Sequence, residues 1–300
     1  MERQISILGA AFGWGAQKGE TERGADVLRN MGVGNTAGIN GFKTSWEGVL
    51  YSPIPRGGHE KSHEEGHDFV HEYNDRLCQR IKVMMRHNKL PVVLGGDHSV
   101  AIGTWSGVVS ALQAEEQFGL IWFDAHMDAH TIESSPSSAY HGMPLATLLG
   151  QGEERMIHMG SKKAKLSPQH VSLVGIRSFE PEEKALLEKL NVRVYYMEEI
   201  QERGFDAVFK EALQRATNGT KGFGMTMDLD GFDPAVAPGT GSLEEGGLTA
   251  DEVLPSLEKL AHHPKFKAFE VVEYNPKLDK GNVTAKLVDK ILLAVFGRKA

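Results

Sequence analysis

The chain alternates between short apolar runs and longer amphipathic stretches along most of its length. The apolar runs are rich in β-branched residues and predict strands at residues 4–8, 91–94, 118–123, 171–174, 192–195, 222–227 and 268–272. Stretches with helical periodicity lie between them, at residues 63–87, 100–112, 181–190, 205–216, 250–262 and 282–296. Strands that alternate with helices are typical of βα units, so the pattern predicts a mainly parallel sheet.

Three of the helical stretches carry additional signals. Thr249 precedes the sequence ADEV as a helix N-cap does, and Pro181 stands where the first turn tolerates a missing N–H donor. The last stretch predicts an amphipathic helix with one apolar stripe, formed by Val283, Leu287, Val288, Ile291, Leu292 and Val295.

No segment of the sequence has the character of an interdomain linker. The clusters of Gly, Pro and Ser at residues 53–58, 134–138 and 235–247 are short and fall between predicted elements, and no internal repeat is visible. A length of 300 residues suits one α/β unit. We therefore predict a single domain over residues 1–300, an α/β fold built as a three-layer α/β/α sandwich around a mainly parallel sheet.

Composition and charge argue against several classes of partner. Lysine and arginine total 33 and aspartate and glutamate total 40, so the net charge of -7 disfavours nucleic acids and acidic membranes. No apolar stretch has the length of a membrane span or the form of a signal peptide. The one cysteine, Cys78, rules out an intramolecular disulfide and is expected to pack as a small apolar residue. We expect a cytoplasmic protein.

Three predicted strands end in clusters of aspartate and histidine: GGDHS at 95–99, DAHMD at 124–128 and DLDGFD at 228–233. The carboxyl ends of strands in an open α/β sheet meet at one edge, where ligands bind. In an extended segment, residues at alternate positions project to the same side, so the side chains of DAHMD converge. GGDHS alone is also typical of a glycine turn with a capping aspartate. The three clusters together predict one binding site.

The pooled side chains predict a site for two divalent cations. The set consists of His98, Asp124, His126, Asp128, Asp228 and Asp230. Buried carboxylates at close range repel one another, and bound cations remove this repulsion. Four carboxylates that can bridge as well as terminate suit two ions about 3.5 to 4 Å apart. Carboxylates with open positions favour manganese or magnesium, imidazoles add affinity for later metals, and the absence of thiolate argues against a structural zinc site, so manganese is the first choice.

A second histidine series recurs every four residues, which would place the imidazoles on one face of a helix. It consists of His59, His63, His67 and His71. A separate metal or pH-sensing site is one interpretation. Because Gly58 and Gly66 interrupt the run and its flanks are polar, we expect a solvated face instead.

Six motifs give the chain a resemblance to the ureohydrolases, the binuclear manganese enzymes that include arginases and agmatinases. In order they are GGDHS (95–99), DAHMD (124–128), HGMPLA (141–146), MDLDGFDPAVAPGTG (227–241), GGLT (246–249) and EVVEYNP (270–276). The resemblance implies a parallel sheet between helices, two Mn²⁺ per subunit and a homo-oligomer, trimeric or hexameric. It assigns one ion to His98, Asp124, Asp128 and Asp228, and the other to Asp124, His126, Asp228 and Asp230.

The resemblance also implies a reaction: a hydroxide that bridges the two ions attacks a guanidinium carbon. Asp128 would transfer the proton that the leaving amine needs. His141 would shuttle protons or stabilise charge, a role that suits a side chain with a pKa near neutrality. Glu273 would pair with the guanidinium, which calls for a bidentate anion.

The substrate depends on the residues around the pocket, because arginine carries an α-carboxylate that agmatine lacks. His130 and Ala139 stand where arginases commonly have asparagines, while Ser137 and Ser138 remain as hydroxyl donors. Further expected substrate contacts are Glu180, in the position of an aspartate that meets the α-ammonium, and Ser242.

Within the ureohydrolases the amino-terminal segment, HGMPLA and EYNP are more similar to arginases. We therefore predict hydrolysis of L-arginine to L-ornithine and urea. One alternative is another ureohydrolase, acting on agmatine or on a guanidino or formimino acid. The other is a metal-binding regulatory protein that has lost catalysis.

Overall fold

The computed structural model describes residues 4–17, 19–35, 43–54, 63–113, 116–258 and 260–297. Within these ranges eight strands form one sheet in the order β2-β1-β3-β8-β7-β4-β5-β6, and every neighbouring pair is parallel. The strands are β1 (Gln4–Ala11), β2 (Lys43–Tyr51), β3 (Lys89–Leu94), β4 (Phe118–Phe123), β5 (Val171–Ile176), β6 (Arg193–Tyr196), β7 (Gly222–Asp228) and β8 (Phe266–Val272). All seven predicted strands are present.

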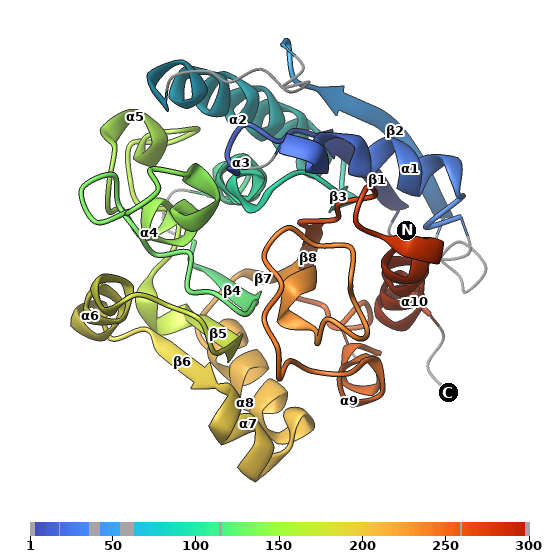
Figure 1. Cartoon of the computed structure of the whole chain (residues 1–300). Coiled ribbons are helices and arrows are strands. Elements are labelled where there is room, and N and C mark those ends of the chain that lie inside the picture. The colour runs from blue at the N-terminus through green and yellow to red at the C-terminus, as the bar shows by residue number, and fades with distance from the viewer. Residues whose placement is uncertain are drawn as a thin grey trace.

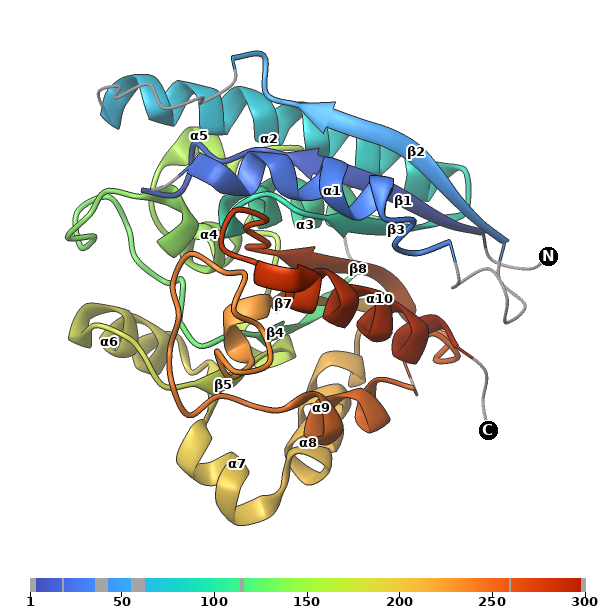
Figure 2. The same cartoon turned by 45° about the vertical axis from the view of Figure 1, so that its right-hand side comes forward.

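Helices cover both faces of the sheet (Figures 1 and 2), which confirms the three-layer α/β/α architecture. They are α1 (Gly24–Asn30), α2 (His63–Arg86), α3 (Ala101–Ser110), α4 (Pro144–Leu148), α5 (Glu154–Ile157), α6 (Pro181–Leu190), α7 (Met197–Arg203), α8 (Phe205–Thr217), α9 (Ala250–Leu257) and α10 (Val283–Phe296). One apolar cluster packs α8, α9 and α10 against the sheet, and a second packs α2, α3 and α4. No helix within the described ranges is both long and apolar enough to span a membrane.

Burial on both faces explains why the strands read as continuous apolar runs. All residues of β4, with the sequence FGLIWF, are buried, and so are all residues of β5 and β7. The edge strand β2 was missed because its sequence, KTSWEGVLY, mixes polar and apolar positions and its side chains are mostly half-buried. Segment 43–51 forms a strand because it pairs with β1, a contact that the sequence of β2 alone does not indicate.

Two helix predictions need correction. Helix α9 ends at Leu257 instead of residue 262, because the chain turns there and Ala261 donates a hydrogen bond to the carbonyl of Val295 in α10. Val283 does not belong to the buried stripe of α10: its side chain is 43% exposed, since it occupies the first turn. The other five residues of the predicted stripe are buried.

The predicted N-terminal signals of two helices are confirmed. Thr249 and Glu252 form a reciprocal capping box at α9. Pro181 occupies the first turn of α6, where Glu180 and Glu183 form a second capping box. This second box also fixes two carboxylates at the edge of the sheet where the strands end.

Four neighbouring strands, β3, β8, β7 and β4, form the centre of the sheet. Because all are parallel, their carboxyl ends lie at the same edge. The segments that leave these ends contain the motifs GGDHS, EYNP, DLDGFD and DAHMD. The fold thus brings together four motifs that are far apart in the sequence.

Candidate metal centre

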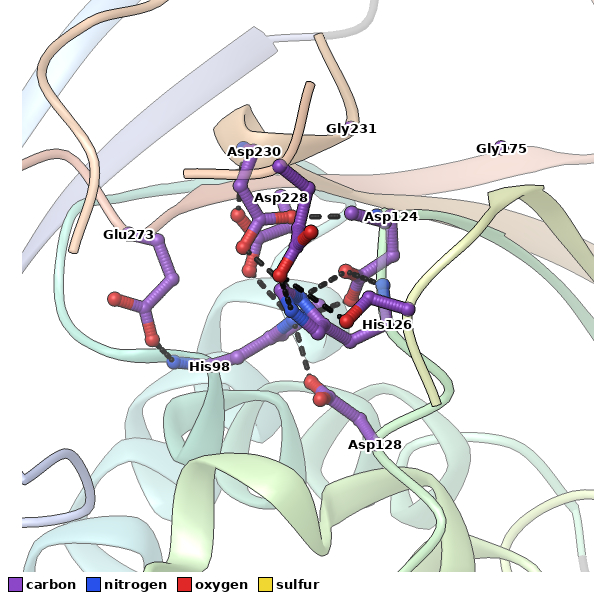
Figure 3. Close-up of polar contacts among 12 residues, drawn as sticks. His98, Asp124, His126, Asp128, Gly175, Asp228, Asp230, Gly231 and Glu273 are labelled. Carbon is purple, nitrogen blue, oxygen red and sulfur yellow. Dashed lines mark hydrogen bonds and ion pairs between the residues drawn. The ribbon is translucent and has the colours of Figure 1, made fainter. Parts of the chain in front are cut away.

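The structure brings all six predicted ligands to one cluster at the carboxyl edge of the sheet, as Figure 3 shows. His98 begins the short 3-10 helix η3 (His98–Val100) after β3. The DAHMD residues follow β4, Asp228 is the last residue of β7, and Asp230 lies in the next 3-10 turn, η6 (Leu229–Gly231). The prediction that these motifs share one edge is correct in its geometry.

His98 lies at the centre of three carboxylates. Its Nδ1 is 3.1 Å from Asp124 Oδ2, 2.9 Å from Asp128 Oδ2 and 3.1 Å from Asp228 Oδ2. The side chain of His98 is 1% exposed. Despite these short distances, Nδ1 makes no well-aligned hydrogen bond to any residue that the structure describes. A buried nitrogen without a partner, facing several carboxylate oxygens, is the arrangement that a bound cation would satisfy.

The other nitrogen of His98 defines its tautomer. Nε2 lies 3.0 Å from Thr226 Oγ1, and the Thr226 hydroxyl donates to Glu270 Oε2 at 2.7 Å. Since the hydroxyl proton is directed at Glu270, the hydroxyl oxygen accepts from Nε2–H. When Nδ1 carries no proton, its lone pair is directed at the three carboxylates. This is the state in which histidine binds a metal.

His126 has a different environment. Its Nδ1 is 3.1 Å from Asp230 Oδ2 and 3.6 Å from Asp124 Oδ1, whereas its Nε2 is 3.6 Å from Glu244 Oε1. The side chain is 25% exposed. Asp124 thus contacts both histidines. Its two oxygens face different imidazoles, as a bridging carboxylate requires.

The electrostatics of the cluster also fit cations. Burial raises the pKa of Asp228 well above its usual value, and the charges of Asp230 and Asp124 raise it further. Burial likewise raises the pKa of Asp230, to about 6. Burial alone would lower the pKa of His98, but the surrounding carboxylates raise it well above 6.5. Protons and metal ions compete for such a cluster, so divalent cations would replace the protons that it otherwise retains.

The ligand atoms form two overlapping groups. His98, Asp124 and Asp128 form one, and Asp124, His126 and Asp230 form the other, each with its atoms within 4.8 Å of one another. These oxygens and imidazoles, without thiolate, suit manganese or a similar divalent ion. The residues present therefore fit the implied metals.

Glu273 is held rigidly beside this cluster. Its Oε1 accepts a hydrogen bond from the backbone N–H of His98 at 2.8 Å and lies 3.3 Å from His141 Nδ1. Its backbone N–H donates to the carbonyl of Gly96. Glu273 has a φ of 64° and Asp128 a φ of 49°, both in the left-handed region. Such strain costs about 1 to 3 kcal/mol per residue and concentrates at functional sites.

His141 and Glu273 form a charged pair. Burial would lower the pKa of His141, but its contact with Glu273 raises it to about 9. The backbone N–H of His141 donates to the carbonyl of Gly15, and the N–H of Gly15 donates to Asp97 Oδ2 at 2.9 Å. Asp97, from the GGDHS motif, therefore holds the segment against which His141 is fixed.

A pocket of 360 Å³ opens onto the cluster. Ser137, Ser242, His130, His141 and Glu273 line it, and so do five further acidic residues: Asp128, Asp228, Asp230, Glu180 and Glu183. No lysine or arginine is among its lining residues in the described part of the chain. Ser138 does not line this pocket; it has a φ of 54° and its N–H donates to Ser135 Oγ. The pocket therefore favours a cationic ligand.

His130 uses both ring nitrogens within the protein. Nε2 is 3.0 Å from Glu180 Oε2 and 3.5 Å from Glu183 Oε2, and Nδ1 is 3.1 Å from Ser134 Oγ. Burial raises the pKa of Glu183 to about 8. This geometry favours a role for His130 in holding Glu180 rather than as a free donor.

The remaining predictions have mixed outcomes. Cys78 is buried, as expected, and burial raises the pKa of its thiol to about 11. His59 and the side chain of His63 lie outside the described residues. His67 packs edge-on against Tyr140, with ring centroids 4.6 Å apart. The prediction of a solvated histidine face therefore does not hold at His67, which is half-buried because this part of α2 faces Tyr140.

Sequence reasoning missed three residues that support the cluster. Thr226 and Glu270 are linked to His98, and Arg177 donates to the backbone carbonyl of Asp230. Thr226 and Glu270 are buried polar residues inside largely apolar strands. A buried polar residue in such a run needs a partner. The sequence shows these polar residues within the apolar runs, but it does not show which residues they pair with.

Comparison with known proteins identifies the chain's family. The family model described as "Arginase family" matches residues 3–297. The chain is 35% identical to arginase of Bacillus caldovelox, with 99% of each chain covered, and 35% identical to arginase of Brevibacillus brevis, with 100% and 99% covered. The native structure of the Bacillus caldovelox arginase superimposes with a TM-score of 0.91 at 33% identity, covering 99% of both chains. The chain belongs to the arginase family.

Proposed function

We propose that this protein hydrolyses L-arginine to L-ornithine and urea, using two Mn²⁺ per subunit. The observation that carries the proposal is the cluster itself: His98 Nδ1 is buried, makes no well-aligned hydrogen bond to a described residue, and faces three carboxylates beside Glu273. The similarity to proteins named arginase, over nearly the whole chain, supports arginine as the substrate.

The metals would be held by the two overlapping groups described above, which share Asp124. Asp228, whose Oδ2 lies 3.1 Å from His98 Nδ1, would complete the set of six ligands. Two bound cations supply one thing that these side chains lack, a strong nucleophile made from water at neutral pH. Substrate orientation and proton transfer would be carried out by side chains of the protein.

Glu273 would bind the substrate guanidinium. Since its Oε1 is already held by the backbone of His98, the carboxylate is oriented before the substrate arrives. A guanidinium presents two parallel N–H donors, so a fixed carboxylate positions the reacting carbon. Glu273 is therefore assigned to substrate orientation rather than to metal binding.

Proton transfer would involve Asp128 and His141. The leaving amine must gain a proton before it departs, and Asp128, whose Oδ2 lies 2.9 Å from His98 Nδ1 in the cluster, would deliver it. With its pKa raised to about 9, His141 is protonated at neutral pH and can return protons to the site. Both side chains line the pocket.

Glu180 would meet the α-ammonium of arginine, and His130 would hold Glu180 in place through Nε2. Ser137 and Ser242 line the same pocket and would donate hydroxyl hydrogen bonds, Ser137 to the α-carboxylate. Ser138 remains a predicted contact whose hydroxyl would have to reach the substrate from outside this lining.

A urea-release screen tests the proposal. Manganese-loaded protein is assayed with L-arginine, agmatine and a series of guanidino acids. We expect the highest kcat/KM with L-arginine. A higher value with agmatine would identify a different ureohydrolase activity. No urea from any of these compounds, with manganese bound, would instead favour the regulatory alternative.

A further inference from the structure

A carboxylate from the loop after β7 lies beside His126. Glu244 Oε1 is 3.6 Å from His126 Nε2, the ring nitrogen that faces away from Asp124 and Asp230. In the described part of the chain, Glu244 is the only carboxylate recorded within 4.0 Å of this nitrogen. Its side chain is 38% exposed. The catalytic scheme above gives this residue no task.

Arg177, which follows β5, clamps the Glu244 loop to the metal centre. Its Nη2 donates to the carbonyl of Asp230 at 2.7 Å and to the carbonyl of Glu244 at 2.8 Å, while its Nε donates to the carbonyl of Glu245 at 3.2 Å. The fixed fork of a guanidinium can join several acceptors at once. One side chain therefore connects the backbone of a candidate ligand to the backbone of the loop.

Ser178 fixes the side chain of Glu244. Its hydroxyl donates to Glu244 Oε1 at 3.1 Å, and its backbone N–H donates to the carbonyl of Ala125 at 3.0 Å. Ala125 immediately precedes His126. Ser178 thus links the backbone next to this imidazole with the carboxylate that faces it.

Close packing keeps the loop in this position. A Cβ on Gly247 would lie 2.6 Å from Arg177 Nη2 and 2.6 Å from the backbone nitrogen of Asp233. Gly246 N–H also donates to Asp233 Oδ2 at 3.0 Å. The loop therefore approaches the β7 end more closely than a side chain at residue 247 would permit.

We propose that Glu244 is a positioning residue for His126. Its carboxylate faces Nε2–H and thereby holds the tautomer whose Nδ1 lone pair points at Asp124 and Asp230. A histidine that binds a metal through one nitrogen commonly donates the other N–H to a carboxylate, which orients the ring and strengthens the ligand. The inference rests on the proposed metal centre.

Glu245 provides a matched control. It is the next residue in the same loop, carries the same charge and is exposed. Arg177 contacts its backbone carbonyl, which a side-chain substitution leaves in place. Any effect of loop charge alone on the metals should therefore appear equally in both positions.

The test measures manganese binding directly. Full-length wild type and the variants Glu244→Ala, Glu244→Gln and Glu245→Ala are freed of metal with a chelator and titrated with Mn²⁺, following free Mn²⁺ by its electron paramagnetic resonance signal. For Glu244→Ala we expect one of the two dissociation constants to rise about 10-fold and the other to stay within about twofold. For Glu244→Gln the rise should be smaller, because the amide oxygen can face Nε2–H as the carboxylate oxygen does.

Urea release provides a second readout. In Glu244→Ala the Mn²⁺ concentration for half-maximal activity should rise by the same factor, while the KM for arginine at saturating Mn²⁺ is unchanged. Equal Mn²⁺ affinities in Glu244→Ala and Glu245→Ala would overturn the proposal, whether both fall or neither does. If the wild type itself binds no Mn²⁺ or releases no urea, the proposed function fails instead, so the two failures are distinguishable.

Discussion

The two histidines of the cluster are supported in opposite ways. His98 is 1% exposed, stacks on Trp122 with ring centroids 4.3 Å apart, and is connected through Thr226 to Glu270 inside the sheet. His126 is 25% exposed and faces Glu244, which belongs to a loop. Asp124 contacts both imidazoles, so the halves share a ligand but differ in what holds them.

The surroundings of His98 are therefore rigid, whereas those of His126 can adjust. The contacts of His98 involve residues of paired central strands, and water has no access to replace them. The contacts of His126 include the partly exposed carboxylate of Glu244, 3.6 Å from Nε2, which water can replace. A change in the loop around residue 244 can therefore alter one half of the centre without disturbing the sheet. Substitutions of the residues that contact His98 should therefore weaken metal binding and activity more than substitutions of the residues that contact His126.

Removal of the imidazoles themselves should have the largest effect and should expose the asymmetry. His98→Ala leaves three buried carboxylates crowded without the imidazole between them, so we expect arginine kcat/KM to fall by more than the roughly 100-fold typical of lost supporting contacts. His126→Ala opens a position that water can reach, and the fall should be smaller. Steady-state urea release at saturating Mn²⁺ compares them. Equal losses would contradict the proposed difference between the halves.

Glu273 contacts the backbone of His98 but is assigned to the substrate. In Glu273→Gln the amide oxygen can still accept the N–H of His98, while the negative charge that pairs with the guanidinium is lost. We expect kcat/KM for arginine to fall about 100-fold, or roughly 3 kcal/mol. Metal analysis should still find the wild-type manganese content. Loss of manganese together with activity would make Glu273 part of the His98 half instead.

The hydrogen-bonded chain from His98 through Thr226 to Glu270, the buried relay, should have a smaller effect. Its loss should lower metal affinity first. Thr226→Val removes the acceptor for His98 Nε2–H and a donor to Glu270. We therefore expect the Mn²⁺ dissociation constant to rise about 10- to 100-fold. Metal-free stability should also fall by about 1 to 3 kcal/mol, because buried polar groups lose partners. Mn²⁺ titration and urea denaturation measure the two effects.

Thr226→Ser is the matched control for this relay, because it keeps the hydroxyl and removes only a methyl group. It should retain most of the wild-type affinity for Mn²⁺. If Thr226→Val weakens Mn²⁺ binding no more than Glu244→Ala does, the buried relay has no special importance.

The sequence was most informative where local pattern determines structure. Continuous apolar runs identified seven strands, and the ends of β3, β4 and β7 identified the candidate ligands. The relay was not foreseen because Thr226 and Glu270 are paired across β7 and β8, and strand register is not written in either strand alone. The contact of Glu244 with His126 was equally hidden, since it depends on Arg177 and Ser178 from another strand end.

His130 shows a different limit of sequence reasoning. Its position suggested a substrate donor, yet Glu180 and Ser134 occupy both ring nitrogens. A residue type at a motif position indicates which chemistry is available. Ser134 lies four residues further along the same loop, but Glu180 is the N-cap of α6, and only the folded chain brings it to His130.

The central claim is that two overlapping ligand groups make one two-metal centre for arginine hydrolysis. The most direct measurement titrates metal-free protein with Mn²⁺ and follows bound manganese and urea release from L-arginine in the same samples. We expect binding to saturate at two Mn²⁺ per chain, with full activity reached only as the second ion binds. Full activity with one ion per chain, or two bound ions without urea release, would contradict the account.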